Sequence, residues 1–420
     1  MHKHFLLFRA CAAFFLSLPL GFALSQPPTP ALAYACEQTP APASHQTTPT
    51  RRNLGLFFDK LRAQKTVSVA YFGGSNAAGL EAKTPYRAHI AQWLKQQFPS
   101  AKLSELNAAV PGTGALYGAL RARRDVIAYK PDLVFLDFAL PESQDAPEAE
   151  EAFKKALEGL LRQFLIVPQP PEIVLLYAAN AKRPDTPNTG RVAWCEALAT
   201  HYQIPALDLQ TAAWKLIDEG QLKPSVFGPG VFGPGVFGKD GAAANDELHK
   251  AYGQQITAFL AAQAALTPTP LVRNLVNPLV SDEMNYGEFK AIAEIKHSPL
   301  WKTETSHDRA LPAALLVTDK PGAELDLFFD GTVVGLTFQV GPQGGAFECL
   351  IDGKPAPAPL TKVDGYDAAT RLQTRIIPGG LPQGEHKLTI RVTAERAQKS
   401  HGNQVKLGSL LVGGQRPEKL

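Results

Sequence analysis

The chain has 420 residues and a formal net charge of only +3, from 42 Lys and Arg against 39 Asp and Glu. No basic patch stands out, which argues against a nucleic-acid partner. The composition, 45% hydrophobic and 19% charged, is that of a folded protein, and the length allows two domains of ordinary size.

The N-terminus predicts export. An apolar run over residues 5–24 follows basic residues and precedes a proline-rich stretch, which is typical of a secretory signal peptide. We assign 1–35 to this signal and expect a periplasmic or extracellular protein. An uncleaved membrane anchor is the alternative, disfavoured because Arg9 and Pro19 interrupt the run. Residues 36–55, rich in Pro, Thr and Ala, are predicted to form a disordered tether.

Residues 56–265 alternate between strand and helix patterns. We expect strands at 67–72, 102–107, 133–138, 173–177 and 204–209. We expect helices at 85–97, 118–129, 148–164, 191–202 and 246–264. Nearly continuous apolar strands between helices predict a three-layer α/β domain with a flavodoxin-like parallel sheet. The chemistry of such a sheet lies beyond the carboxyl ends of its strands.

A short repeat interrupts this pattern at 226–239. The segment reads Val-Phe-Gly-Pro-Gly twice and then Val-Phe-Gly-Lys. We interpret it as a duplication tolerated in a surface loop, because lengthening a loop costs little free energy. An apolar flap over the site is the alternative.

From residue 285 the pattern changes to a period of two. Residues 266–284 are predicted to be a linker, and 285–415 an all-β sandwich of jelly-roll type. Its strands are expected at 325–329, 333–340, 346–351, 371–377, 386–392 and 405–412.

The cysteines predict neither a disulfide framework nor a metal site. Cys11 lies in the signal, and the other three are far apart and odd in number, so they cannot all pair. No set of Cys and His has the spacing of a zinc site, and we expect no metal and no cofactor.

The first strand of the α/β region runs into Gly73-Gly74-Ser75. A rigid strand, a glycine turn and a helix N-terminus are how an α/β hydrolase presents a nucleophile, so Ser75 is the candidate. An esterase of this kind also needs a base, a group that orients the base, and donors for the oxyanion.

Three segments in order, 71–79, 106–114 and 130–140, resemble conserved blocks of the SGNH (GDSL) hydrolase family. The resemblance covers about 65–260 and implies a serine ester hydrolase fold. It implies that Ser75 is the nucleophile, that the backbone N–H groups of Ser75 and Gly112 line the oxyanion hole, and that Asp240 orients the base. The C-terminal region resembles the sandwich appended to some bacterial SGNH proteins linked to carbohydrate esters, which implies an acylated glycan as partner.

The sequence departs from the family pattern at two positions. Pro141 stands where the family has the asparagine whose amide is the third oxyanion donor, and proline offers neither a side-chain donor nor an N–H. Ala243 stands where the family has the histidine base. An unassisted serine hydroxyl is a poor nucleophile, so this pattern predicts a degenerate catalytic set.

His249 is the only substitute base that we weigh in detail, because Asp246 and His249 repeat the Asp-x-x-His spacing. A packing histidine on the last helix is the interpretation that we favour. Asp137, Glu142 and Asp240 are expected near the strand ends, in loop capping and solvation.

These observations predict an exported esterase-like protein with lost or much reduced activity, a pseudoenzyme that keeps glycan binding. One alternative is an active esterase or O-deacetylase on acylated polysaccharide that uses Ser75 and His249. Another is a glycan- or protein-binding module in the sandwich.

Overall fold

The computed structural model describes residues 51–139, 150–183, 190–228, 231–233, 235–238, 243–268, 275–307 and 311–415. The predicted signal peptide and residues 36–50 of the tether lie outside these ranges, as do Pro141, Glu142 and Asp240. Within the described ranges, none of the helices combines the length and the apolar character needed to span a bilayer.

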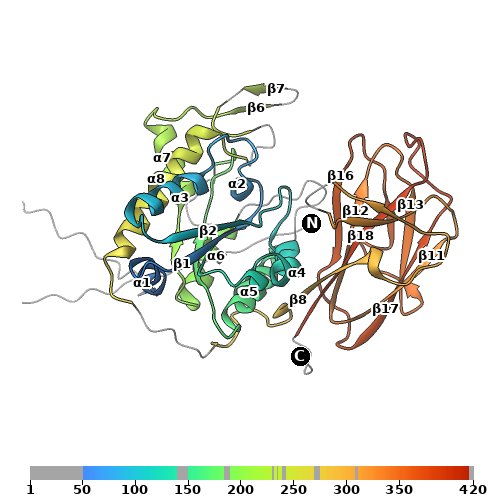
Figure 1. Cartoon of the computed structure of the whole chain (residues 1–420). Coiled ribbons are helices and arrows are strands. Elements are labelled where there is room, and N and C mark those ends of the chain that lie inside the picture. The colour runs from blue at the N-terminus through green and yellow to red at the C-terminus, as the bar shows by residue number, and fades with distance from the viewer. Residues whose placement is uncertain are drawn as a thin grey trace, which may run out of the picture. The chain divides into compact units, whose positions relative to one another are not determined.

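The first part of the chain forms a five-stranded parallel sheet in the order β2-β1-β3-β4-β5. This confirms the predicted α/β class. Figure 1 labels the helices around this sheet and its strands β1 and β2. The strands are β1 Thr66–Gly73, β2 Lys102–Asn107, β3 Leu133–Asp137, β4 Glu172–Leu176 and β5 Ala206–Leu207. The helices are α1 Gly55–Arg62, α2 Ser75–Ala78, α3 Tyr86–Gln97, α4 Ala115–Asp125, α5 Glu150–Leu165, α6 Gly190–His201, α7 Leu209–Asp218 and α8 Asp246–Ala264, with a 3-10 turn at Ile127–Tyr129.

The side chains of β1 divide between two hydrophobic cores, one on each face of the sheet. Val67, Val69 and Tyr71 join the core under α1, α3, α7 and α8. Ala70 and Phe72 join the core under α4, α5 and α6. The alternation follows from the period of two in a strand, and it makes the fold three layers thick.

The chain is already ordered before residue 56. The backbone N–H of Arg52 donates to the Gln203 carbonyl (2.9 Å), and Leu54 is buried. The Glu172 carboxylate accepts the first N–H groups of α1, from Leu56 (3.2 Å) and Phe57 (2.8 Å). Residues 51–55 therefore differ from the predicted tether, because a distant carboxylate caps a helix that has no cap of its own.

The second part of the chain forms two antiparallel sheets around a separate apolar core, which confirms the predicted sandwich. One sheet has the order β16-β12-β18-β10-β9, with β8 also paired to β18, and the other has the order β11-β17-β13-β14, with β15 also paired to β13. The strands are β8 Tyr286–Ala291, β9 Lys302–Thr305, β10 Ala314–Thr318, β11 Glu324–Asp330, β12 Val333–Val340, β13 Ala346–Ile351, β14 Lys354–Pro355, β15 Lys362–Asp364, β16 Arg371–Ile377, β17 Glu385–Val392 and β18 Val405–Gly414.

The three copies of the repeat take two different structures. The first two form a short antiparallel hairpin, β6 Val226–Gly228 and β7 Val231–Gly233 (Figure 1). The third copy is buried: Val236 and Phe237 are at most 1% exposed, and Phe237 bridges to Ala244. Only the first two copies therefore have the character of a loop insertion.

The segment between the two parts is bound to α5. The Glu158 carboxylate accepts backbone N–H groups from Leu279, Val280 (2.7 Å) and Ser281 (3.0 Å). The Arg162 guanidinium donates to the carbonyl of Val276 (2.8 Å). Residues 275–284 of the predicted linker are thus a fixed segment.

The sandwich shares apolar contacts with the α/β layer. Met284, Val333 and Leu411 belong to the same core as α4 and α5. Gly287 on β8 lies so close to α4 that a Cβ atom there would overlap the carbonyl oxygen of Ala119. Close packing of this kind leaves no room for a side chain.

Replacing this glycine tests whether the contact stabilises the whole chain. We expect Gly287→Val to lower the free energy of unfolding by about 3 kcal/mol, because the added atoms have only backbone to displace. Lys290→Val, on the same strand but at a side chain that is 41% exposed, is the matched control and should change stability little. Urea denaturation measures both, and equal values for the two variants would contradict the prediction.

Candidate active site

Ser75 lies at the carboxyl edge of the sheet. The strand β1 ends at Gly73, Gly74 precedes the helix, and Ser75 begins α2 with only 3% of its surface exposed. A Cβ at Gly73 would overlap the backbone carbonyl oxygen of Asp137 on β3, so the turn needs glycine to approach its neighbour. The structure thus gives the predicted nucleophile its expected strand, turn and helix.

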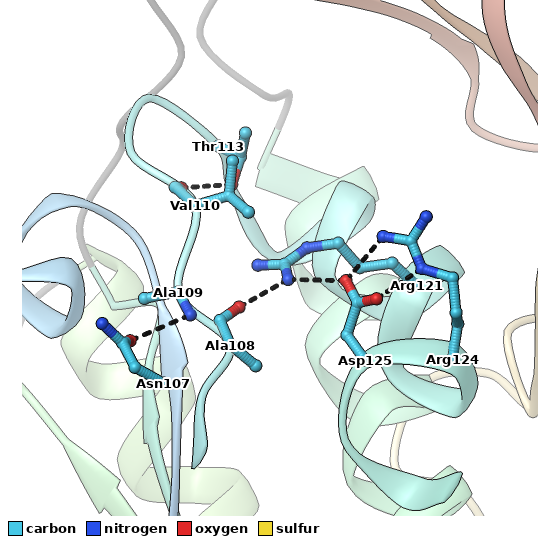
Figure 2. A network of polar contacts seen from close by, with 8 residues as sticks. All are labelled: Asn107, Ala108, Ala109, Val110, Thr113, Arg121, Arg124 and Asp125. Atoms are coloured by element: carbon cyan, nitrogen blue, oxygen red, sulfur yellow. Dashed lines mark hydrogen bonds and ion pairs between the residues drawn. The ribbon is translucent and has the colours of Figure 1, made fainter. Parts of the chain in front are cut away.

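The loop after β2 is fixed against β1. The N–H of Ala108 donates to the Tyr71 carbonyl (2.9 Å), and the N–H of Val110 donates to the Gly73 carbonyl (3.1 Å). The Thr113 hydroxyl donates to the carbonyl of Val110 (2.7 Å), as Figure 2 shows.

Gly112 lies inside this loop with φ of 71°, in the left-handed region that favours glycine. The N–H of Val110 donates to the carbonyl of Gly73, two residues before Ser75. The loop that carries Gly112 therefore lies at the same edge of the sheet as the Ser75 turn. Ser75 and Gly112, two of the predicted oxyanion positions, thus follow the ends of the neighbouring strands β1 and β2.

Ala243 also belongs to this edge. The Asn76 side chain, directly after Ser75, accepts the N–H of Ala244 (3.0 Å). The carbonyl of Ala243 accepts the N–H of Gly238 (2.7 Å), and Ala243 is fully buried. The position of the expected base is therefore tied to the residue next to the nucleophile, and it carries a methyl group. Asp240, its expected orienting partner, lies outside the described residues.

His249 is buried on α8. Its Nδ1 accepts the backbone N–H of Tyr86 (3.2 Å), and its ring packs against those of Tyr86 (5.6 Å between centroids) and Tyr252 (6.2 Å). An accepting Nδ1 implies, by the hydrogen bond, a neutral ring with its proton on Nε2. Among the described residues, Nε2 has no hydrogen-bond partner. The lone pair of Nδ1 is thus engaged by Tyr86, and Nε2 carries the proton. Neither nitrogen is free to accept a proton from Ser75.

The electrostatics of His249 point the same way. Burial is the main cause that lowers its pKa to about 4, against a smaller opposing effect of Asp246. A base with so low a pKa takes up a proton poorly at neutral pH. The arrangement is that of a packing histidine.

A buried carboxylate, Asp137, ends β3 beside this edge and is only 3% exposed. Its negative charge adds to burial in raising the pKa of the Tyr86 and Tyr252 hydroxyls. The Tyr252 oxygen accepts the N–H of Ala179 (2.9 Å). The sequence predicted a solvated loop carboxylate here, and the structure instead buries it as the last residue of a strand that is buried along its whole length.

Asn76, Tyr86 and Tyr252 are the site residues that sequence reasoning missed. The only signal was their position within or next to the recognised segments. Within the described residues, no group of His, Cys, Asp and Glu is arranged to hold a metal ion.

Two solved structures of a two-domain esterase active on acetylated mannans are similar to this chain. One, crystallised with mannopentaose, is 19% identical, covers 88% of this chain and 97% of its own, and has a TM-score of 0.71. The other is 20% identical, covers 88% and 98%, and has a TM-score of 0.69. An acetylxylan esterase from Geobacillus stearothermophilus is 14% identical over 48% of this chain and 94% of its own, with a TM-score of 0.37. None of the family models and none of the curated proteins matches this sequence.

At these identities the likeness to the mannan esterase shows the fold. The chain shares the two-part fold of these two structures, an α/β layer followed by antiparallel sheets. The chemistry must be argued from this chain's own residues.

The burial of His249 predicts a pH dependence of stability. Its pKa is near 6.5 in the unfolded chain and about 4 in the folded one. Between these two pH values His249 is protonated in the unfolded state and neutral in the folded state. The stabilising effect is complete above pH 6.5 and is lost as the pH falls. Between pH 7.5 and 4.5 we expect the free energy of unfolding of the wild type to fall by about 2.5 kcal/mol more than that of His249→Asn. Urea denaturation at the two pH values measures this, and parallel losses would contradict it.

Proposed function

We propose that this chain is an exported protein of the SGNH carbohydrate-esterase lineage whose ester hydrolysis is lost or much reduced, and that it binds acylated polysaccharide. The observation that carries the proposal is the methyl group of Ala243, tied by Ala244 and Asn76 to the nucleophile turn. The fold of an esterase active on acetylated mannans supports the class of partner.

The physical argument rests on two missing groups. Without a base, the Ser75 hydroxyl keeps its proton as it attacks, and a positioned base is typically worth about 100- to 10,000-fold in rate. Pro141 in place of an asparagine removes one oxyanion donor, which typically costs about 100- to 1,000-fold. An ester bound beside Ser75 would therefore persist.

The alternative of an active esterase with His249 as base requires a rearrangement. His249 would have to release the N–H of Tyr86 and turn out of its contacts with Tyr86 and Tyr252. A buried N–H without a partner costs free energy, so the rearranged state is disfavoured.

Hydrolysis of a short-chain aryl acetate tests the loss of activity. We expect the wild type to be no faster than Ser75→Ala, because neither has an activated hydroxyl. The double variant Ala243→His with Pro141→Asn should exceed the wild type by about 100-fold or more, since it restores a base and a donor.

The same double variant in a Ser75→Ala background is the matched control and should stay at the wild-type level. Robust wild-type turnover, comparable to that of the double variant and abolished by Ser75→Ala, would overturn the proposal. If His249→Asn abolished that turnover as well, His249 would be the base.

Binding is tested by titrating the full chain with acetylated mannan and with the same polymer after deacetylation. We expect tighter binding of the acetylated polymer, because the proposed oxyanion donors, the N–H groups of Ser75 and Gly112, would bind the acyl oxygen. Phe328→Ala is the control for the sandwich alternative, since Phe328 is 71% exposed on the outer face of β11. Binding lost in Phe328→Ala would assign it to the sandwich, and equal affinity for both polymers would contradict an acyl-reading site.

A further inference from the structure

The base of the Gly112 loop is held by a fully buried arginine on α4. Nη1 of Arg121 donates to the carbonyl of Ala108 at 2.6 Å. Its guanidinium carbon lies 4.4 Å from the ring centroid of Phe72, which immediately precedes Gly73, and 5.3 Å from that of Tyr117. Arg121 therefore contacts both chain segments that carry the predicted oxyanion donors.

The Ala108–Ala109 peptide unit is held on both of its polar sides. Arg121 binds its carbonyl oxygen, and the Asn107 side chain accepts its N–H at 3.2 Å (Figure 2). This peptide lies between β2 and Gly112, so its orientation sets the direction in which the loop leaves the sheet.

Arg121 is in turn bound to a chain of residues that ends in the sandwich. Its Nη1 lies 3.1 Å from the Asp125 carboxylate one turn along α4. The same carboxylate accepts from Nε and Nη2 of Arg124, the second at 2.9 Å. The guanidinium carbon of Arg124 lies 3.4 Å from the ring centroid of Phe289 on β8. Figure 2 shows the polar part of this series.

Burying a guanidinium in a core position carries a large desolvation penalty. Burial lowers the pKa of Arg121, and among the described residues its Nε and Nη2 have no hydrogen-bond partner. An apolar side chain of similar size would avoid this penalty. The bond to the Ala108 carbonyl is what an apolar side chain at this position could not supply.

We propose that the sandwich is part of the framework of the site: Phe289 fixes Arg124, Arg124 fixes Asp125, and Asp125 fixes Arg121, which positions the Ala108–Gly112 loop. Arg121 acts as a positioning residue. The Ala108–Gly112 loop is positioned in this way whether the site hydrolyses an ester or only binds one.

Two adjacent arginines of α4 provide a matched pair for the test. Arg124 stacks on Phe289 and is bound to Asp125, whereas Arg123 stacks on Tyr286 of the same strand at 5.2 Å. Amide hydrogen exchange of the full chain, followed by mass spectrometry over peptides that span 106–114, reads the order of the loop without any substrate.

We expect Arg124→Gln and Phe289→Leu to speed exchange in 106–114 while β1 keeps its protection, and Arg123→Gln to leave the loop unchanged. Arg121→Lys should speed it by about 10- to 100-fold, the equivalent of one hydrogen bond to a charged group. The combination of Arg121→Lys and Arg124→Gln should add little to Arg121→Lys alone, since both break one series.

Loop exchange that is unchanged in Arg124→Gln would overturn the proposal. So would equal acceleration in Arg123→Gln, because the effect would then come from general contact between α4 and the sandwich. Because no hydrolysis or glycan enters the measurement, these outcomes are independent of the proposed function.

Discussion

The parallel pairing of β1 with β2 and β3 is the constraint on which the site depends. The hydrogen-bond ladder continues past the end of β2, where the Tyr71 and Gly73 carbonyls accept N–H groups from Ala108 and Val110. On the other side the register sets Gly73 directly opposite Asp137. Three chain segments are thereby fixed at one edge by backbone bonds, and the side chains at that edge have little freedom in where they lie.

Electrostatics then decides what this edge can do. A buried imidazole, a buried carboxylate and several buried hydroxyls lie in or beside it, and burial shifts the pKa of the imidazole and of the tyrosine hydroxyls away from neutral pH. Burial keeps His249 neutral and keeps the tyrosine hydroxyls protonated. A low dielectric favours neutral forms unless an opposite charge compensates, and here the main charge effect on Tyr86 and Tyr252, that of Asp137, opposes their ionisation.

Much of the fold could be predicted from the sequence, because hydrophobic periodicity reports local burial. The limits of β2, α8, β12, β13 and β16 agree with the structure to the residue, since each combines a clear period with a clear end. The helix α1 escaped prediction because its cap is Glu172, more than a hundred residues away. Strand β8 escaped because it buries two adjacent residues, Tyr286 and Gly287, and leaves the rest half-exposed, so its burial does not alternate.

The candidate site was predictable in its backbone and less so in its side chains. Ser75 and Gly112 follow recognisable strand ends, so their positions could be expected. Arg121 could not, because an arginine among alanines and arginines on a helix has the pattern of an exposed residue. Tyr117 covers it from one turn earlier on α4, and the other contacts come from Phe72 on β1 and from the loop at Ala108, which are separate segments of the chain.

The backbone arrangement around Ser75 and Gly112 is therefore not by itself evidence of catalysis. Gly73 is required by the close approach of β3, and Arg121 donates to the carbonyl of the half-buried Ala108. Each feature that would position an oxyanion also stabilises the join between β1, β2 and α4. Position 243 is different, because the bonds that hold this segment come from its backbone: the N–H of Ala244 donates to Asn76, and the carbonyl of Ala243 accepts from Gly238. These bonds do not depend on the side chain at 243, so the hydrogen bonding of this edge places no demand on which residue stands there.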